Sequence, residues 1–131
     1  MKTTLLILAG AAILAWWFRR RMTPSVGVLV ERAAATGDLG PLLAALEGKR
    51  ERVRPTAYHQ AITLLWDRYE RRPAIELIRE LAARHPDARI AQYWMQQAIT
   101  TEPELAGKSL SPEFLERNFQ PEVAAACGPA G

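Results

Sequence analysis

The sequence predicts an all-α protein in which a single N-terminal transmembrane helix precedes a small array of antiparallel helical hairpins. An uninterrupted apolar run within residues 1–22 predicts the transmembrane helix. Over residues 23–119, apolar side chains recur at helical spacing between prolines, glycines and capping residues, and no alternating pattern indicates a strand. Residues 120–131 hold few bulky apolar side chains and are predicted to form a flexible C-terminal tail.

Residues 1–22 have the features of an uncleaved membrane anchor. Every residue from Leu5 to Phe18 is apolar or glycine, a length that overlaps the apolar part of a removable signal peptide. The run ends in bulky residues followed by basic ones, whereas the cleavage site of a signal peptide needs small residues. A retained anchor is therefore preferred, and a cleaved signal is the alternative. Tryptophan favours the headgroup region and arginine reaches lipid phosphates. Six side chains are therefore predicted at the membrane interface: Trp16, Trp17, Phe18, Arg19, Arg20 and Arg21.

The positive charge of the chain belongs mainly to this anchor. The formal net charge is +3, and without Lys2 and the three arginines, 13 basic residues stand against 14 acidic ones. The predicted helical domain therefore has almost no net charge, which gives no reason to expect a nucleic-acid partner. Because positive residues are retained in the cytoplasm, the arginines predict a single-pass membrane protein whose C-terminal domain is cytoplasmic.

The first predicted hairpin occupies residues 25–48. A threonine, a proline and a serine over residues 23–25 suit the start of a helix. Gly37 ends this helix, and Asp38 is placed to cap a second helix that ends at Gly48. The apolar face of the first helix is predicted from four residues at helical spacing: Val26, Leu29, Val30 and Ala33.

Four more helices are predicted after a polar connector over residues 49–55. The first three cover residues 56–72, 73–85 and 88–100, and Pro86 separates the last two because proline cannot continue a helix. A short helix over residues 111–119 has Ser111 as its cap and Pro112 at its first position. The turns between these helices are short, which favours antiparallel hairpins.

The helices over residues 55–100 also carry a known repeat pattern in part. Its aromatic, apolar, small and helix-ending positions match Tyr58, Ala61, Ile62, Leu65, Ala74, Ile78 and Pro86. On these residues, the stretch 55–88 resembles one tetratricopeptide repeat of about 34 residues, and 89–100 resembles the first helix of a second. The chain departs from the pattern at Leu81, where a small residue is usual, and lacks the glycine common in the first helix. The resemblance implies a surface that binds peptides or other proteins.

The connector over residues 49–55 is rich in basic side chains. Because a basic residue near an anionic membrane surface contributes about 1 kcal/mol, four of them are candidates for contact with lipid headgroups: Lys49, Arg50, Arg52 and Arg54. Contact with nucleic acid is an alternative, and a solvated loop between helices is the ordinary interpretation of such a run.

The helical domain contains a group of aromatic side chains with two interpretations. Core packing between adjacent helices is the default. The functional alternative is a groove that receives a peptide or helix of a partner protein, and the candidate partner-binding residues are then Tyr58, Trp66, Tyr69, Tyr93 and Trp94. Substitution of the two tryptophans separates these interpretations.

No pattern of residues predicts catalysis, so the protein is not expected to be an enzyme. His59 and His85 have no second histidine or cysteine at ligand spacing, and no metal site, cofactor or small-molecule substrate is expected. We therefore expect a membrane-anchored binding module, an accessory or assembly subunit of a larger membrane complex, whose partners are membrane lipid and other protein subunits. The alternatives are a free-standing adaptor or quality-control factor that binds peptides, and an exported periplasmic domain released by signal cleavage.

Overall fold

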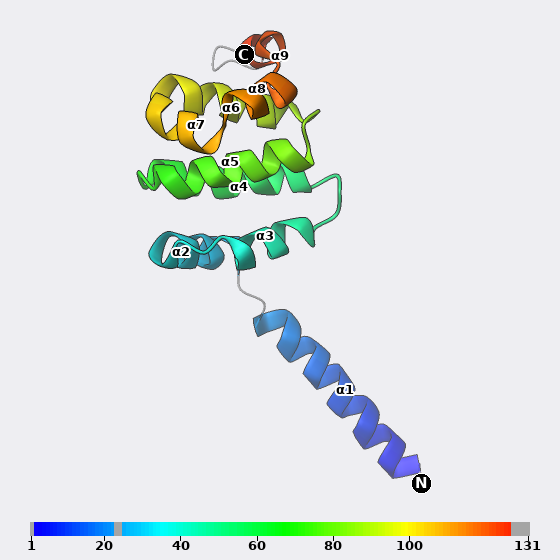
Figure 1. Cartoon of the computed structure of the whole chain (residues 1–131). Helices are drawn as coiled ribbons and strands as arrows, with labels where there is room; N and C mark the ends of the chain where they lie inside the picture. The colour runs from blue at the N-terminus through cyan, green and yellow to red at the C-terminus, as the bar shows by residue number, and fades with distance from the viewer. Residues whose placement is uncertain (1, 23–24, 127–131) are drawn as a thin grey trace.

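The computed structural model of the chain describes residues 2–22 and 25–126, with the side chains of residues 7–17 and 25–126. Within these ranges the regular elements are all helices, which confirms the all-α prediction. Figure 1 shows α1 standing apart from a stack of shorter helices. The helices are α1 (Lys2–Met22), α2 (Val26–Thr36), α3 (Gly40–Glu47), α4 (Arg54–Asp67), α5 (Arg71–Arg84), α6 (Arg89–Thr101), α7 (Pro103–Ser109), α8 (Pro112–Asn118) and α9 (Pro121–Ala126).

The prediction of a transmembrane helix is wrong. Among the residues that the structure describes, no helix is both long enough and apolar enough to cross a membrane. The apolar part of α1, from Leu5 to Phe18, is about 21 Å long at 1.5 Å per residue, whereas the hydrocarbon core of a bilayer is about 30 Å thick. Five residues of that part are alanine or glycine, which add little hydropathy. The predicted signal-anchor and the single-pass location with a cytoplasmic domain are wrong for the same reason.

The six side chains predicted at a membrane interface are described only in part. Trp16 and Trp17 are exposed on α1, at 59% and 46%. The side chains of Phe18, Arg19, Arg20 and Arg21 lie outside the described residues.

The ends of α2 follow the predicted capping pattern. The Ser25 Oγ accepts a hydrogen bond from the Val28 N–H at 3.4 Å, which satisfies one of the free donors of the first turn. Gly37 ends the helix at a φ of 77°, a left-handed conformation that suits glycine because it has no Cβ. The Asp38 carboxylate accepts from the Gly40 N–H at 2.9 Å and so begins the turn into α3.

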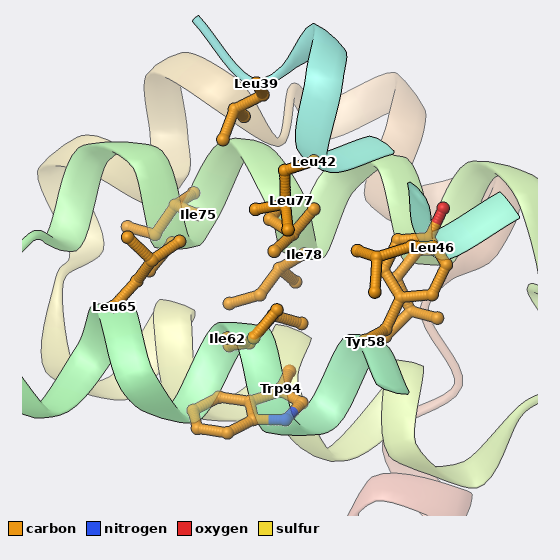
Figure 2. Close-up of a cluster of buried hydrophobic side chains, with 14 of the residues drawn as sticks. Leu39, Leu42, Leu46, Tyr58, Ile62, Leu65, Ile75, Leu77, Ile78 and Trp94 are labelled. Atoms are coloured by element: carbon orange, nitrogen blue, oxygen red, sulfur yellow. The ribbon is translucent and has the colours of Figure 1, made fainter. Parts of the chain in front are cut away.

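The helices after α1 form a stack of antiparallel hairpins, in which α2 pairs with α3, α4 with α5 and α6 with α7 (Figure 1). The first helices of the three hairpins pack against one another in the order α2, α4, α6, and α5 contacts α4, α6 and α7. Figure 2 shows the core side chains of α3, α4 and α5 meeting one another, with Trp94 of α6 beside them. Six fully buried residues come from α4 and α5: Tyr58, Ile62, Leu65, Leu77, Ile78 and Leu81.

The turn between α4 and α5 differs from the prediction, which extends the first of these helices to residue 72. Tyr69 adopts a left-handed conformation with a φ of 60°, and the Glu70 N–H donates to the Leu65 carbonyl at 3.0 Å. This is the hydrogen bond of a Schellman motif, which terminates a helix. Therefore α4 ends at Asp67, and α5 begins at Arg71, two residues before the predicted start.

Two helices, α7 and α9, occupy stretches for which the sequence pattern predicts none. Each begins with a Pro-Glu pair, as α8 does. Proline presets φ in the first turn, and a glutamate there interacts favourably with the helix dipole. Residues 121–126, within the predicted flexible tail, are helical, and α9 packs on α6 with Ala124 buried.

Gln92 of α6 fastens this C-terminal region to the stack. Its side chain is buried, and its Nε2 donates to the carbonyls of Pro86 at 2.9 Å and Asn118 at 2.8 Å. Its Oε1 accepts from the Gln120 N–H at 2.6 Å. One buried amide thus satisfies three backbone groups at the two ends of a 35-residue stretch, from Pro86 to Gln120.

Candidate functional site

The five aromatic side chains predicted to bind a partner do not share one surface. Tyr58 is fully buried and Trp94 is only 5% exposed, so both belong to the core (Figure 2). Trp66 and Tyr93 are half-buried and pack against the core from outside. Tyr69 is 81% exposed at the turn between α4 and α5. For Tyr58 and Trp94, core packing is the correct interpretation.

Trp94 connects α6 with α4 through its ring and its indole N–H. Its Nε1 donates to the His59 Nδ1 at 2.9 Å, and its ring centroid lies 5.5 Å from that of Trp66 and 5.3 Å from that of Tyr93. Because an indole N–H can only donate, the His59 Nδ1 is the acceptor and carries no proton. The His59 side chain in this arrangement is therefore a neutral imidazole with its proton on Nε2.

Arg71 covers the outer side of Trp66. Its guanidinium carbon lies 3.9 Å from the Trp66 ring centroid and 5.3 Å from that of Tyr69, and its Nη1 lies 4.0 Å from the Glu102 carboxylate. The Nε and Nη1 atoms are buried without a hydrogen-bond partner among the described residues. The cation–π contact and the ion pair compensate for this burial. Since Arg71 lies over it, Trp66 does not present its ring to a partner.

An uncharged surface runs over the first helices of the hairpins. Residues 55–66 of α4, 90–101 of α6 and 26–30 of α2 contain no Asp, Glu, Lys or Arg. By contrast, α5 carries six charged residues among its 14. On α4 and α6, the solvent-accessible side chains of the uncharged surface are Thr56, His59, Gln60, Thr63, Leu64, Ile90, Tyr93, Gln96, Gln97, Ile99, Thr100 and Thr101, together with half-buried Trp66 under Arg71.

A groove of about 540 Å³ opens in the uncharged surface between α2 and α4. Leu64 lies at its edge and is 39% exposed. The Thr63 Oγ1 donates to the His59 carbonyl at 2.7 Å, and the Ser25 Oγ accepts from the Val28 N–H. Both hydroxyls are therefore already hydrogen-bonded to the backbone of α4 and α2. The lining of the groove includes Val26, Gly27, His59, Gln60, Thr63 and Leu64. The groove is therefore mainly apolar, and His59 is the lining residue whose polar side chain is held by a hydrogen bond to another helix.

A polar cluster of a different kind joins α3, α4 and α5 around Glu47. Its carboxylate accepts a hydrogen bond from the Tyr58 hydroxyl, and its Oε1 lies 3.4 Å from the His85 Nε2 and 3.7 Å from the Arg84 Nη1. Burial raises the pKa of Glu47, but the hydrogen bonds from Tyr58 and His85 and the nearby positive charges outweigh it, so the pKa is lowered. Burial and the carboxylate together raise the pKa of Tyr58, which keeps its hydroxyl protonated as a donor.

The basic connector leads away from the Glu47 cluster. The Arg54 Nη1 lies 4.0 Å from Glu47, and its Nε donates to the Lys49 carbonyl at 2.8 Å. Arg54 and Lys49 are half-buried, whereas Arg50 and Arg52 are exposed. Contact of these four side chains with lipid headgroups stays a prediction.

No family model, curated protein or solved structure matches the chain. Within the described ranges, no three histidine, cysteine or acidic side chains are grouped so that they could hold a metal ion. The groove and the uncharged surface around it are the candidate functional site.

Sequence reasoning singled out the aromatic residues and missed those that line the groove. The signal that it did not use is the distribution of charge. In a chain with 24% charged residues, two helices contain charge-free runs over 55–66 and 90–101. The solvent-facing side of a helix normally carries charge, so such runs distinguish α4 and α6 from an ordinary surface helix.

Proposed function

We propose that this protein is a helical protein-binding module, tetratricopeptide-like in its hairpins, that docks a segment of a partner protein on the uncharged surface. The observation that carries the proposal is the absence of charge over residues 26–30 of α2, 55–66 of α4 and 90–101 of α6, beside the densely charged α5. The centres of protein interfaces are depleted of charged residues, because a charge that loses its water without a partner costs free energy.

The groove between α2 and α4 supports the same proposal. Arrays of helical hairpins bind partners along the extended surfaces that they create, and a groove lined by Val26 and Leu64 accommodates apolar side chains of a docked segment. The module acts as an adaptor, since the proposed site contains no grouping of nucleophile, base and acid.

Selection from a peptide display library on the purified full chain tests this proposal. Dissociation constants of the enriched peptides are then measured for the wild type and for Leu64→Glu. We expect the substitution to weaken binding at least ten-fold, because it buries a carboxylate against an apolar ligand.

Val53→Glu is the matched control for Leu64→Glu. Val53 is also an exposed aliphatic residue, at 47%, and lies just before α4 in the connector, outside the groove lining. It should leave the affinity unchanged. Equal affinities of all three proteins for the enriched peptides would refute binding on the uncharged surface.

A further inference from the structure

We infer that the groove recognises an extended, uncharged segment whose apolar side chains flank a backbone carbonyl, and that the Nε2–H of His59 donates to that carbonyl. The inference rests on the proposed function and deepens it, because it names the chemistry of the docked segment and the residue that selects it. Trp94 is the positioning residue that keeps the proton of His59 on Nε2.

His59 lines the groove, and its Nδ1 accepts a hydrogen bond from the indole N–H of Trp94 at 2.9 Å. A neutral imidazole has one donor nitrogen and one acceptor nitrogen. With Nδ1 fixed as the acceptor, Nε2 is the donor, and no described residue forms a hydrogen bond with it. Trp94 is only 5% exposed, so water does not readily replace His59 as the acceptor for the indole N–H.

The groove favours a ligand without charge. The groove lining contains no Lys, Arg, Asp or Glu that could pair with a charged ligand. The free energy needed to remove water from an unpaired charge there exceeds the free energy gained from one hydrogen bond to a neutral donor. A carboxylate or an ammonium group is therefore excluded from the centre of the groove. An uncharged acceptor is favoured, because it satisfies the Nε2–H at a small desolvation cost.

An extended ligand suits the His59 donor better than a helical one. Within the interior of an α-helix the backbone carbonyls already accept from N–H groups four residues along, so the side of a docked helix presents no free backbone carbonyl to His59. An extended segment has free carbonyls and places alternate side chains on opposite sides. One such carbonyl at His59 leaves the flanking apolar side chains to contact Val26 and Leu64 on either side of the groove.

His59→Leu tests the donor directly. It keeps an apolar side chain in the groove and removes the N–H, and we expect peptides enriched on the wild type to bind it about three- to ten-fold more weakly, the loss of one hydrogen bond. His85→Leu is the matched control, because it makes the same substitution at a histidine in the Glu47 cluster, outside the groove lining. The affinity of this variant should not change. Equal binding by His59→Leu and the wild type would overturn the inference.

Nitrogen NMR of the histidine side chains tests the positioning role of Trp94 without any ligand. The wild-type His59 should show a single neutral form with the proton on Nε2, and Trp94→Phe should show a mixture of the two neutral forms. A wild-type His59 with its proton on Nδ1 would contradict the argument, even if Trp94→Phe fails to fold.

The outcomes separate this inference from the proposed function. Enriched peptides that require a charged residue, or that bind as helices, would overturn the inference. If the same peptides bind Leu64→Glu more weakly than the wild type, docking on the uncharged surface is still supported. Enriched peptides that are insensitive to Leu64→Glu would overturn both.

Discussion

Tyr58→Phe removes one hydroxyl from the place where three helices meet, and its effect can be worked out from the structure. The Tyr58 side chain is fully buried and donates to the Glu47 carboxylate. Phenylalanine fills the same space without the hydroxyl, so the lost hydrogen bond is the main change. Hydrogen bonds to charged groups contribute about 1.5–3 kcal/mol. Because the Glu47 side chain is 25% exposed and regains some water, we expect the free energy of unfolding to fall by about 1.5–2 kcal/mol at neutral pH.

Urea denaturation followed by circular dichroism measures this difference, with Tyr93→Phe as the control. Tyr93 is half-buried, and its hydroxyl has no hydrogen bond to any described residue, so its substitution should change stability by less than about 0.5 kcal/mol. A Tyr58→Phe variant as stable as the Tyr93→Phe variant would refute the assignment of Glu47 and Tyr58 as a stabilising pair.

The pH dependence gives a second, independent check on the same pair. The pKa of Glu47 is lowered in the folded protein from its ordinary value of 4.5. A lowered pKa contributes stability above that ordinary value, and the contribution is lost as the pH falls through the lowered one. The difference between the wild type and Tyr58→Phe should therefore shrink below about pH 4.5, because a protonated Glu47 loses the charge-assisted part of the bond. A difference that stays constant down to pH 3 would contradict this reasoning.

Two further predictions concern the C-terminal helices and the turn after α4. Gln92→Leu leaves three backbone groups unpaired, so we expect a loss of about 2–4 kcal/mol and faster amide exchange over residues 118–126. Unchanged exchange there would show that Gln92 does not hold α8 and α9. Tyr69→Gly relieves a left-handed tyrosine and should raise the free energy of unfolding by about 0.5–1 kcal/mol, whereas Tyr69→Phe should not. Destabilisation by the glycine would mean that contact with Arg71 outweighs the strain.

Much of the helical framework could be predicted from local sequence. The helices over α2 to α6 and α8 were expected near their observed positions, because apolar spacing, caps and prolines act within one or two turns of chain. A regularity in the C-terminal part was missed: Pro-Glu pairs begin α7, α8 and α9 at Pro103, Pro112 and Pro121, nine residues apart. The same local signals that predicted α8 were present for its two neighbours.

The N-terminal prediction failed because apolar composition does not by itself provide the length and hydropathy that a membrane requires. The run from Leu5 to Phe18 is free of charge, but alanine and glycine make up much of it and it is short. The bulky aromatic residues that end the run and the basic residues after it are typical of an anchor but do not lengthen its apolar span.

The sequence by itself determined that this chain is helical, where most of its helices begin and end, and which faces carry the core. These properties depend on residues three or four positions apart, which the chain places side by side without any tertiary contact. Only the tertiary structure decided that Trp94 meets His59, 35 residues earlier, and that Glu47 meets Tyr58 and His85. It also decided that α2 and α4 enclose a groove. Such pairings depend on how hairpins stack, and no periodicity within one helix encodes them.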